Sequence, residues 1–245
     1  MEKEFVLIID FGSQVTQLIA RRLRELNVYC EIHPFNKVND EFLKIIDPKA
    51  IILSGGPASV LNDNAPKPPL SIYDLEIPIL GICYGQQIMM KMLGGSVVSG
   101  SGTSEFGKSY VNINNKSKDI KLLEGLFLDE EKEEVWMSHG DHVASIPNDF
   151  EVYGISENAP FAIIGNEKKH FYGVQFHPEV IHTLNGKVLI KNFLKISNFS
   201  FNWSMQSYLQ QSLEEIKMKV GNKKVICALS GGVDSSVTAV LINKA

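Results

Sequence analysis

The chain has 245 residues, 44% of them hydrophobic and 21% charged, with a formal net charge of −4. This composition is typical of a soluble globular protein with a sizeable core, in one large domain or in one domain and part of another. The sequence contains no basic patch that would bind a nucleic-acid backbone. It also has no secretory signal and no apolar stretch long enough to cross a bilayer, so we expect a cytoplasmic protein.

The first half of the chain alternates short apolar runs with helical patterns. Apolar spacing predicts strands at 5–9, 28–32, 50–53 and 79–82, helices at 14–26, 39–46 and 86–93, and a helical turn at 70–74. Strands and helices in alternation indicate an α/β fold with a mainly parallel central sheet and helices on both faces.

The pattern then changes to short strands and polar turns over residues 96–152. We interpret this segment as an antiparallel addition at the sheet edge. Residues 161–165 and 171–176 are predicted to form a closing hairpin, and residues 186–196 a terminal helix.

A boundary is predicted near residue 198, which gives a first domain at 1–198 and a second segment at 199–245. The second segment reads as a linker helix at 205–218, an apolar strand at 225–229, a glycine-rich loop and the start of another helix. A lone strand and loop cannot bury a core, so we interpret this segment as a fragment of a second α/β domain.

Three cysteines, Cys30, Cys83 and Cys227, are too few and too scattered for a disulfide framework. They also lack the close pairs typical of a zinc site, and we predict no metal site. In a reducing compartment each is a free thiol that must be judged by its surroundings.

Cys83 stands between a predicted strand and a predicted helix, with Gly81 and Gly85 two residues to either side. This spacing is the Gly-x-Ser-x-Gly nucleophile elbow with sulfur in place of oxygen. The turn exposes the side chain at a helix N-terminus, whose partial positive charge favours a thiolate. A single cysteine is more often a buried structural residue, and the two glycines favour the nucleophile.

A thiolate nucleophile needs a base, and the base needs an orienting group. His177 and Glu179 flank Pro178, which favours an extended backbone in which residues two apart project to the same side. The carboxylate would hold one ring nitrogen and leave the other facing the thiol. An isolated pair of this kind is more often a surface histidine and a solvated glutamate.

The developing oxyanion of an acyl transfer needs hydrogen-bond donors. The Gly-Gly-Pro turn at 55–57 follows another parallel strand, and ligands of such sheets collect at the carboxyl ends of strands. We predict the backbone N–H groups of Gly56 and Tyr84 as donors. An ordinary turn is the alternative.

Three motifs in order resemble the signatures of class I glutamine amidotransferases: Ser-Gly-Gly-Pro at 54–57, Gly-Ile-Cys-Tyr-Gly-Gln-Gln at 81–87 and Gly-Val-Gln-Phe-His-Pro-Glu at 173–179. The resemblance implies hydrolysis of the glutamine amide through a glutamyl thioester, without a cofactor. It assigns Cys83 as nucleophile, His177 as base, Glu179 as its orienter and Gln87 as a glutamine-binding residue. The Ser-His-Gly-Asp stretch at 138–141 resembles a loop near the same site, and we interpret His139 and His142 as structural or site-lining.

A glycine-rich loop near the chain's end resembles the pyrophosphate-binding loop of N-type ATP pyrophosphatases. Glycines between a strand and a helix let backbone N–H groups converge on an anion, and the helix dipole adds to the attraction. The residues assigned to this loop are Ser230, Gly231, Gly232, Val233, Asp234, Ser235 and Ser236.

The opening segment at 9–22 and the Glu-Phe-Gly stretch at 105–107 resemble those of GMP synthetases. That resemblance implies glutamine, ATP and XMP as substrates, Mg²⁺ with the ATP, and a homodimer when the enzyme is full length. The present chain would carry the glutaminase and only the first part of the ATP-using half.

Two alternatives remain open. Another ATP-dependent amidotransferase, such as CTP synthetase or an anthranilate-type synthase component, does not resemble this order of glutaminase and phosphate loop. A cysteine peptidase or a degenerate binding module could use the same scaffold. Gln87 and the complete Cys/His/Glu set favour hydrolysis of free glutamine.

Overall fold

The computed structural model describes residues 4–100, 102–113, 117, 119–127 and 132–245. The chain divides into two compact units, Met1–Phe201 and Asn202–Ala245. The first unit contains every residue predicted for the glutaminase site, and the second contains the predicted phosphate loop.

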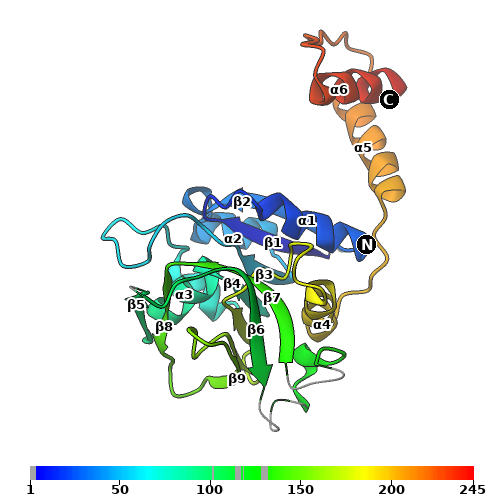
Figure 1. Ribbon diagram of the computed structural model, residues 1–245. Helices are drawn as coiled ribbons and strands as arrows, with labels where there is room; N and C mark the ends of the chain where they lie inside the picture. The colour runs from blue at the N-terminus through cyan, green and yellow to red at the C-terminus, as the bar shows by residue number, and fades with distance from the viewer. Residues whose placement is uncertain (1–3, 101, 114–116, 118, 128–131) are drawn as a thin grey trace. The chain divides into compact units, whose positions relative to one another are not determined.

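The first unit is built on a mixed sheet whose described strands follow the order β2-β1-β3-β4-β11-β10-β9-β6-β7 (Figure 1). The pairs from β2 to β11 are parallel, and those from β11 to β7 are antiparallel. The predicted α/β class, with a mainly parallel sheet and an antiparallel addition at its edge, is therefore confirmed. The strand bounds are β1 Phe5–Asp10, β2 Tyr29–Pro34, β3 Ala50–Leu53, β4 Ile79–Ile82, β6 Glu105–Ile113, β7 Lys132–His139, β9 Glu151–Ile155, β10 Ile163–Asn166 and β11 Phe171–Val174.

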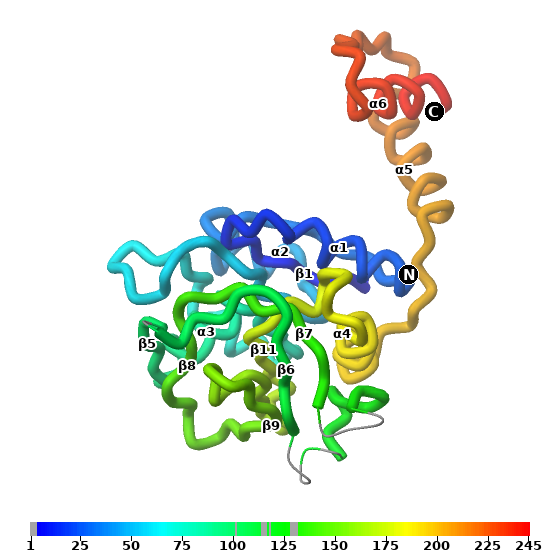
Figure 2. Tube along the Cα trace, viewed as in Figure 1, coloured from blue at the N-terminus to red at the C-terminus, as the bar shows by residue number. Residues whose placement is uncertain are grey.

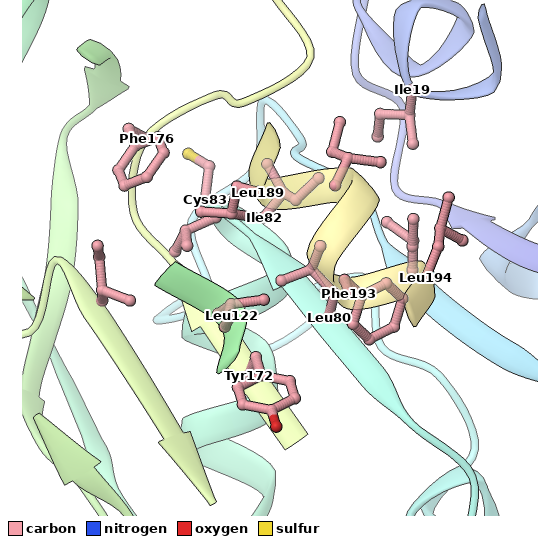
Figure 3. Close-up of a cluster of buried hydrophobic side chains, with 14 of the residues drawn as sticks. Ile19, Leu80, Ile82, Cys83, Leu122, Tyr172, Phe176, Leu189, Phe193 and Leu194 are labelled. Carbon is pink, nitrogen blue, oxygen red and sulfur yellow. The ribbon is translucent and has the colours of Figure 1, made fainter. Parts of the chain in front are cut away.

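Helices cover both faces of the parallel strands because side chains of a strand alternate between faces. In β1, Val6 and Ile8 pack into one buried cluster, and Leu7 and Ile9 into the other. Helices α1 (Thr16–Glu25) and α4 (Gly186–Ile196) contribute to the first cluster, and α2 (Asp40–Ile46) and α3 (Tyr84–Met92) to the second. Figure 3 shows part of the first cluster, with the sulfur of Cys83 at its edge.

A separate two-stranded ribbon, formed by β5 (Ser96–Ser99) and β8 (Asp141–Ser145), lies against α3 (Figure 2). Short 3-10 helices complete the described elements of this unit: η1 Phe35–Lys37, η2 Leu70–Asp74 and η4 Lys121–Leu123. The helical turn predicted at 70–74 is therefore a 3-10 helix.

The second unit consists of α5 (Met205–Val220), a loop and α6 (Val233–Lys244). Ser204 begins α5 with a capping box, in which its hydroxyl accepts from the N–H of Ser207 and the Ser207 hydroxyl accepts from the N–H of Ser204. The strand predicted at 225–229 is wrong, since these residues have no regular structure. A strand needs a neighbour for its backbone groups, and none exists within the described residues 202–245; Ile226 is 98% exposed.

Four parallel strands, β1, β3, β4 and β11, end along one edge of the sheet. The loops that follow them contain most of the residues predicted for the site. None of the helices in the described part of the chain combines the length and apolar character needed to cross a membrane.

Candidate active site

Cys83 occupies a sharp turn between β4 and α3. Its backbone angles are φ 52° and ψ −108°, a conformation that is costly for a residue with a side chain. A Cβ on Gly85 would lie 2.2 Å from the Leu53 carbonyl oxygen, and one on Gly81 would lie 2.7 Å from the Gln86 nitrogen. Both glycines are therefore required by close backbone approach, as the nucleophile elbow predicts.

His177 and Glu179 lie together in the loop after β11. Nδ1 of His177 is 2.8 Å from Oε1 of Glu179, and Glu179 is completely buried. The loop is fixed to β7, because the N–H of His177 donates to the Trp136 carbonyl and the N–H of Trp136 donates to the Thr183 hydroxyl. The contact expected from the spacing of these two residues is therefore present.

The imidazole of His177 also interacts with the Cys83 sulfur, and both residues line the same cavity, so the sulfur, the ring and the carboxylate adjoin one another. Burial alone would lower the pKa of His177, but the hydrogen bonds and charges of Cys83 and Glu179 outweigh it and raise the pKa to about 11. The ring therefore carries a positive charge at neutral pH. A charged imidazole beside the sulfur favours the thiolate, which is the nucleophilic form of cysteine.

A cavity of about 300 Å³ opens onto Cys83 and His177. It is lined by Gly12, Ser13, Gln14, Val15, Gly56, Pro57, Cys83, Trp136, Ser138, His177 and Val180. A larger cavity of about 990 Å³, beside α4 and η4, contains none of the predicted site residues. The chemistry is therefore concentrated at the smaller cavity.

The two predicted oxyanion donors lie near the nucleophile. Gly56 lines the cavity, and its N–H has no hydrogen-bond acceptor among the residues that the structure describes. Tyr84 is the first residue of α3, where an N–H has no acceptor within the helix. A Cβ on Gly56 would lie 3.4 Å from the Tyr84 ring, so the two residues adjoin.

Gln87 lies close to the nucleophile but outside the cavity wall. Its side chain is buried, and its amide nitrogen donates to the Asp141 carbonyl at 2.7 Å and to Oε1 of Gln175 at 3.2 Å. Gln175 in turn donates to the Cys83 sulfur at 3.7 Å. The structure thus places Gln87 behind the nucleophile, where it joins α3 to the 138–141 segment.

Sequence reasoning missed the loop after β1 as part of the site. Residues 12–15 line the cavity. Segment 9–22 resembles other proteins, but none of its residues was assigned to the site from the sequence. The signal was available, because β1 is parallel to β3 and β4 and its carboxyl end lies at the same sheet edge. No sequence pattern indicated that Trp136 and Val180 line the cavity. Trp136 reaches it through the antiparallel pairing of β7, and Val180 through the loop after β11.

The predicted phosphate loop lies at the N-terminus of α6. Gly231 has φ +84°, and no group of the described residues comes within 4 Å of where its Cβ would be, so the backbone bends sharply and stays open. The hydroxyls of Ser235 and Ser236 donate to the Gly232 carbonyl at 3.0 and 2.9 Å. The N–H groups at the start of this helix have no acceptor within it, which suits an anion.

Metal-binding clusters of three or more histidine, cysteine or acidic side chains are absent from the described residues. The three cysteines are all free thiols.

Residues 7–196 match the family model "Glutamine amidotransferase class-I". The chain is 61% identical over 240 residues to a "GMP synthase [glutamine-hydrolyzing]" of Dinoroseobacter shibae, and 54% identical over 241 residues to one of Rhizobium etli. These alignments cover 98% of this chain but only 46% and 45% of the two relatives, so the chain spans about half the length of the curated relatives it matches.

Solved structures share the fold. A Thermoplasma acidophilum protein described as a GMP synthase subunit superposes with a TM-score of 0.66 at 27% identity, over 86% of this chain and 99% of that one. A glutamine amidotransferase of Thermotoga maritima superposes with a TM-score of 0.61 at 18% identity, over 81% of this chain and 100% of that one.

Proposed function

Because the chain belongs to the class I glutamine amidotransferases, we propose that it is the glutamine-hydrolysing part of a GMP synthase and that Cys83, His177 and Glu179 carry the hydrolysis. The observation that carries this proposal is that Cys83 and His177 line one cavity while the His177 ring contacts the buried carboxylate of Glu179 at 2.8 Å. High identity to GMP synthases over nearly the whole chain supports XMP as the molecule that accepts the ammonia.

In the first half of the reaction, the Cys83 thiolate attacks the side-chain amide carbon of glutamine. The carbonyl π bond breaks, and the resulting oxyanion accepts hydrogen bonds from the N–H groups of Gly56 and Tyr84. The His177 imidazolium gives its proton to the amide nitrogen, the C–N bond breaks, and ammonia leaves a glutamyl thioester on Cys83.

In the second half, the now neutral His177 takes a proton from water as the water oxygen attacks the thioester carbon. Collapse of the tetrahedral intermediate breaks the C–S bond and releases glutamate, and the thiolate and imidazolium are restored. Glu179 keeps the ring oriented through both halves, because its carboxylate accepts the Nδ1 proton at 2.8 Å. No cofactor is required for this hydrolysis.

The second unit supports an ATP-dependent acceptor half. The residues at Ser230–Ser236 fit a pyrophosphate group, since the open turn at Gly231 precedes a helix of 12 residues. ATP, bound with Mg²⁺, would transfer its adenylyl group to an XMP oxygen with release of pyrophosphate, and ammonia would then displace AMP to give GMP. Gly232, Val233 and Asp234 would present backbone N–H groups to the phosphates in that reaction.

The proposal includes the partners and compartment of the whole enzyme. Glutamine, ATP and XMP are its substrates, and full-length chains form a homodimer. Free thiols at all three cysteines support a reducing cytoplasm, because the nucleophile must stay reduced. Neither nucleic acid nor a membrane is a partner.

Glutamate release from glutamine tests the hydrolysis, with Cys83→Ala as the variant. Cys30→Ala is the matched control, since Cys30 is also a buried thiol but belongs to β2, with its sulfur 3.7 Å from the Ala20 carbonyl of α1. We expect Cys83→Ala to abolish release without unfolding the chain, and Cys30→Ala to retain it. Equal release by Cys83→Ala and the unaltered chain would remove Cys83 from the mechanism.

The choice of substrate distinguishes the proposed enzyme from a cysteine peptidase and from other ATP-dependent amidotransferases. A cysteine peptidase would cleave internal peptide amides, whereas the proposed enzyme releases ammonia from free glutamine and leaves peptides intact. With the full-length enzyme, ammonia transfer to XMP in the presence of Mg²⁺ and ATP would separate a GMP synthase from other ATP-dependent amidotransferases.

A further inference from the structure

Glu105 on β6 and His139 on β7 form a buried pair beside the active site. They are register partners in the antiparallel β6–β7 ladder, and Nε2 of His139 is 3.1 Å from Oε2 of Glu105. Both side chains are buried. Removing a carboxylate–imidazole pair from water carries a desolvation free-energy penalty, so a buried pair needs further hydrogen bonds to be stable.

Every polar position of this pair has a partner. The Ser156 hydroxyl donates to Oε2 of Glu105 at 2.7 Å, and the Ser109 hydroxyl donates to Oε1 at 2.9 Å. On the other side of the ring, Nδ1 of His139 is 3.1 Å from the carbonyl oxygen of Asp141. A carbonyl can only accept a hydrogen bond, so Nδ1 carries a proton.

On the Nε2 side of the ring, the Glu105 carboxylate already accepts hydrogen bonds from two hydroxyl groups, which favours its ionised form. Nε2 of His139 therefore also donates, and the ring is an imidazolium.

The imidazole controls the position of a strand segment that contacts the nucleophile. The Asp141 carbonyl that accepts from His139 also accepts from Gln87 of α3 at 2.7 Å. One residue before His139, the carbonyl oxygen of Ser138 lies 3.6 Å from the Cys83 sulfur, and Ser138 lines the cavity. The pair thus fixes residues 138–141 between β6 and α3.

We infer that Glu105 and His139 are positioning residues for the glutaminase site: a buried carboxylate–imidazolium pair that holds the 138–141 wall against Cys83 and Gln87. This inference deepens the proposed function and rests on it for the reaction concerned. The pair joins two stretches, 105–107 and 138–141, that resembled related proteins; from the sequence, the first had no assigned role and His139 only a structural or site-lining one.

Nitrogen NMR of chain labelled with ¹⁵N-histidine tests the protonation state without any activity measurement. His139→Gln assigns the signals. We expect both ring nitrogens of His139 to show the protonated shift at neutral pH in the unaltered chain. A ring with a single protonated nitrogen would overturn the ion pair.

Glutamine kinetics test the positioning role. Breaking one partner leaves a buried charge and can unfold the chain, so the informative variant is Glu105→Leu/His139→Phe, in which an apolar pair replaces the ionic one. We expect this double variant to fold and to lose about ten-fold or more in kcat/KM, equivalent to about 1.4 kcal/mol. Ser156→Ala is the matched control, because it removes one donor from the same carboxylate and leaves the link through His139 intact.

A folded double variant with unaltered kcat/KM would overturn the inference. Failure of the proposed function is distinguishable, since the unaltered chain would then release no glutamate while the NMR result would still report on the pair.

Discussion

Nε of Arg22 donates a hydrogen bond to the backbone carbonyl of Glu179 at 3.0 Å, across 157 positions in the chain. Arg22 belongs to α1, and Glu179 is the acid at the end of the proposed catalytic chain. The first helix of the fold therefore holds the loop that places Glu179 under the His177 ring. Glu179 Oε2 is buried and has no hydrogen-bond partner among the described residues, so the orientation of this carboxylate depends on the contact of Oε1 with His177 and on backbone contacts of this kind.

Replacing Arg22 with methionine should reduce the rate of glutamine hydrolysis. Hydrogen bonds from charged groups contribute about 1.5–3 kcal/mol, so a loss of about ten-fold or more in kcat is expected if the loop shifts. Arg21→Met is the matched control, because both arginines pair with Glu25 but Arg21 is 71% exposed while Arg22 is 17% exposed. Equal kcat values for both variants would show that the contact with Glu179 has no catalytic effect.

The charge on His177 should make stability depend on pH in a defined direction. Its pKa rises from an ordinary 6.5 to about 11 on folding, so the folded chain holds this proton more tightly than the unfolded chain. The stabilisation is complete below the unfolded pKa and is lost as the pH rises through the folded value.

Glu179→Gln removes one cause of this shift and should flatten that dependence. We expect the unaltered chain to lose more stability than Glu179→Gln as the pH is raised from about 7 to about 10. Urea denaturation of both proteins at several pH values measures the two slopes. Parallel slopes would show that Glu179 does not stabilise the charged ring.

Gly85 should tolerate no side chain. A Cβ there would lie 2.2 Å from the Leu53 carbonyl oxygen, and neither α3 nor β3 can move aside without opening the core. We expect Gly85→Ala to reduce stability by more than about 3 kcal/mol. Gly140→Ala is the control, since none of the described residues comes within 4 Å of a Cβ at that position. Thermal unfolding of the two variants at equal concentration gives the comparison.

The parallel half of the fold could be predicted because local patterns determine it. The continuous apolar run of β1 indicates a strand covered on both faces, and its side chains do pack into two clusters. The glycines at 81 and 85 indicate the close backbone approach that a nucleophile elbow around Cys83 needs. The contact of His177 with Glu179 could likewise be predicted from their spacing, because side chains two positions apart in an extended backbone project to the same side.

The rest depends on partners distant in the chain. Neither the contact of Arg22 with Glu179 nor the pairing of Glu105 with His139 leaves a local pattern, because each joins separate elements. Gln87 was predicted to contact glutamine from its place in a motif, but its buried amide binds Asp141 and Gln175. That assignment stays a prediction. The strand expected at 225–229 failed for the opposite reason, since its apolar pattern is real and its partners are missing from residues 202–245.

Alkylation should distinguish the cysteines by their electrostatic surroundings. Burial raises the pKa of Cys30 to about 11, with a smaller opposing effect from the charge of Arg24, so Cys30 is a neutral thiol at pH 7. Cys83 lies beside the positively charged His177 and opens onto the cavity. Only thiolates react rapidly with iodoacetamide, so Cys83 should be alkylated in the folded chain and Cys30 should not.

Peptide mass spectrometry after a short reaction at about pH 7 reads each site separately, and glutamine should protect Cys83 by filling the cavity. His177→Gln should slow alkylation of Cys83 by about ten-fold or more, because the positive charge that favours the thiolate is lost. Unchanged alkylation in His177→Gln would mean that the imidazolium does not sustain the thiolate, and a different origin for the reactivity of Cys83 would then be required.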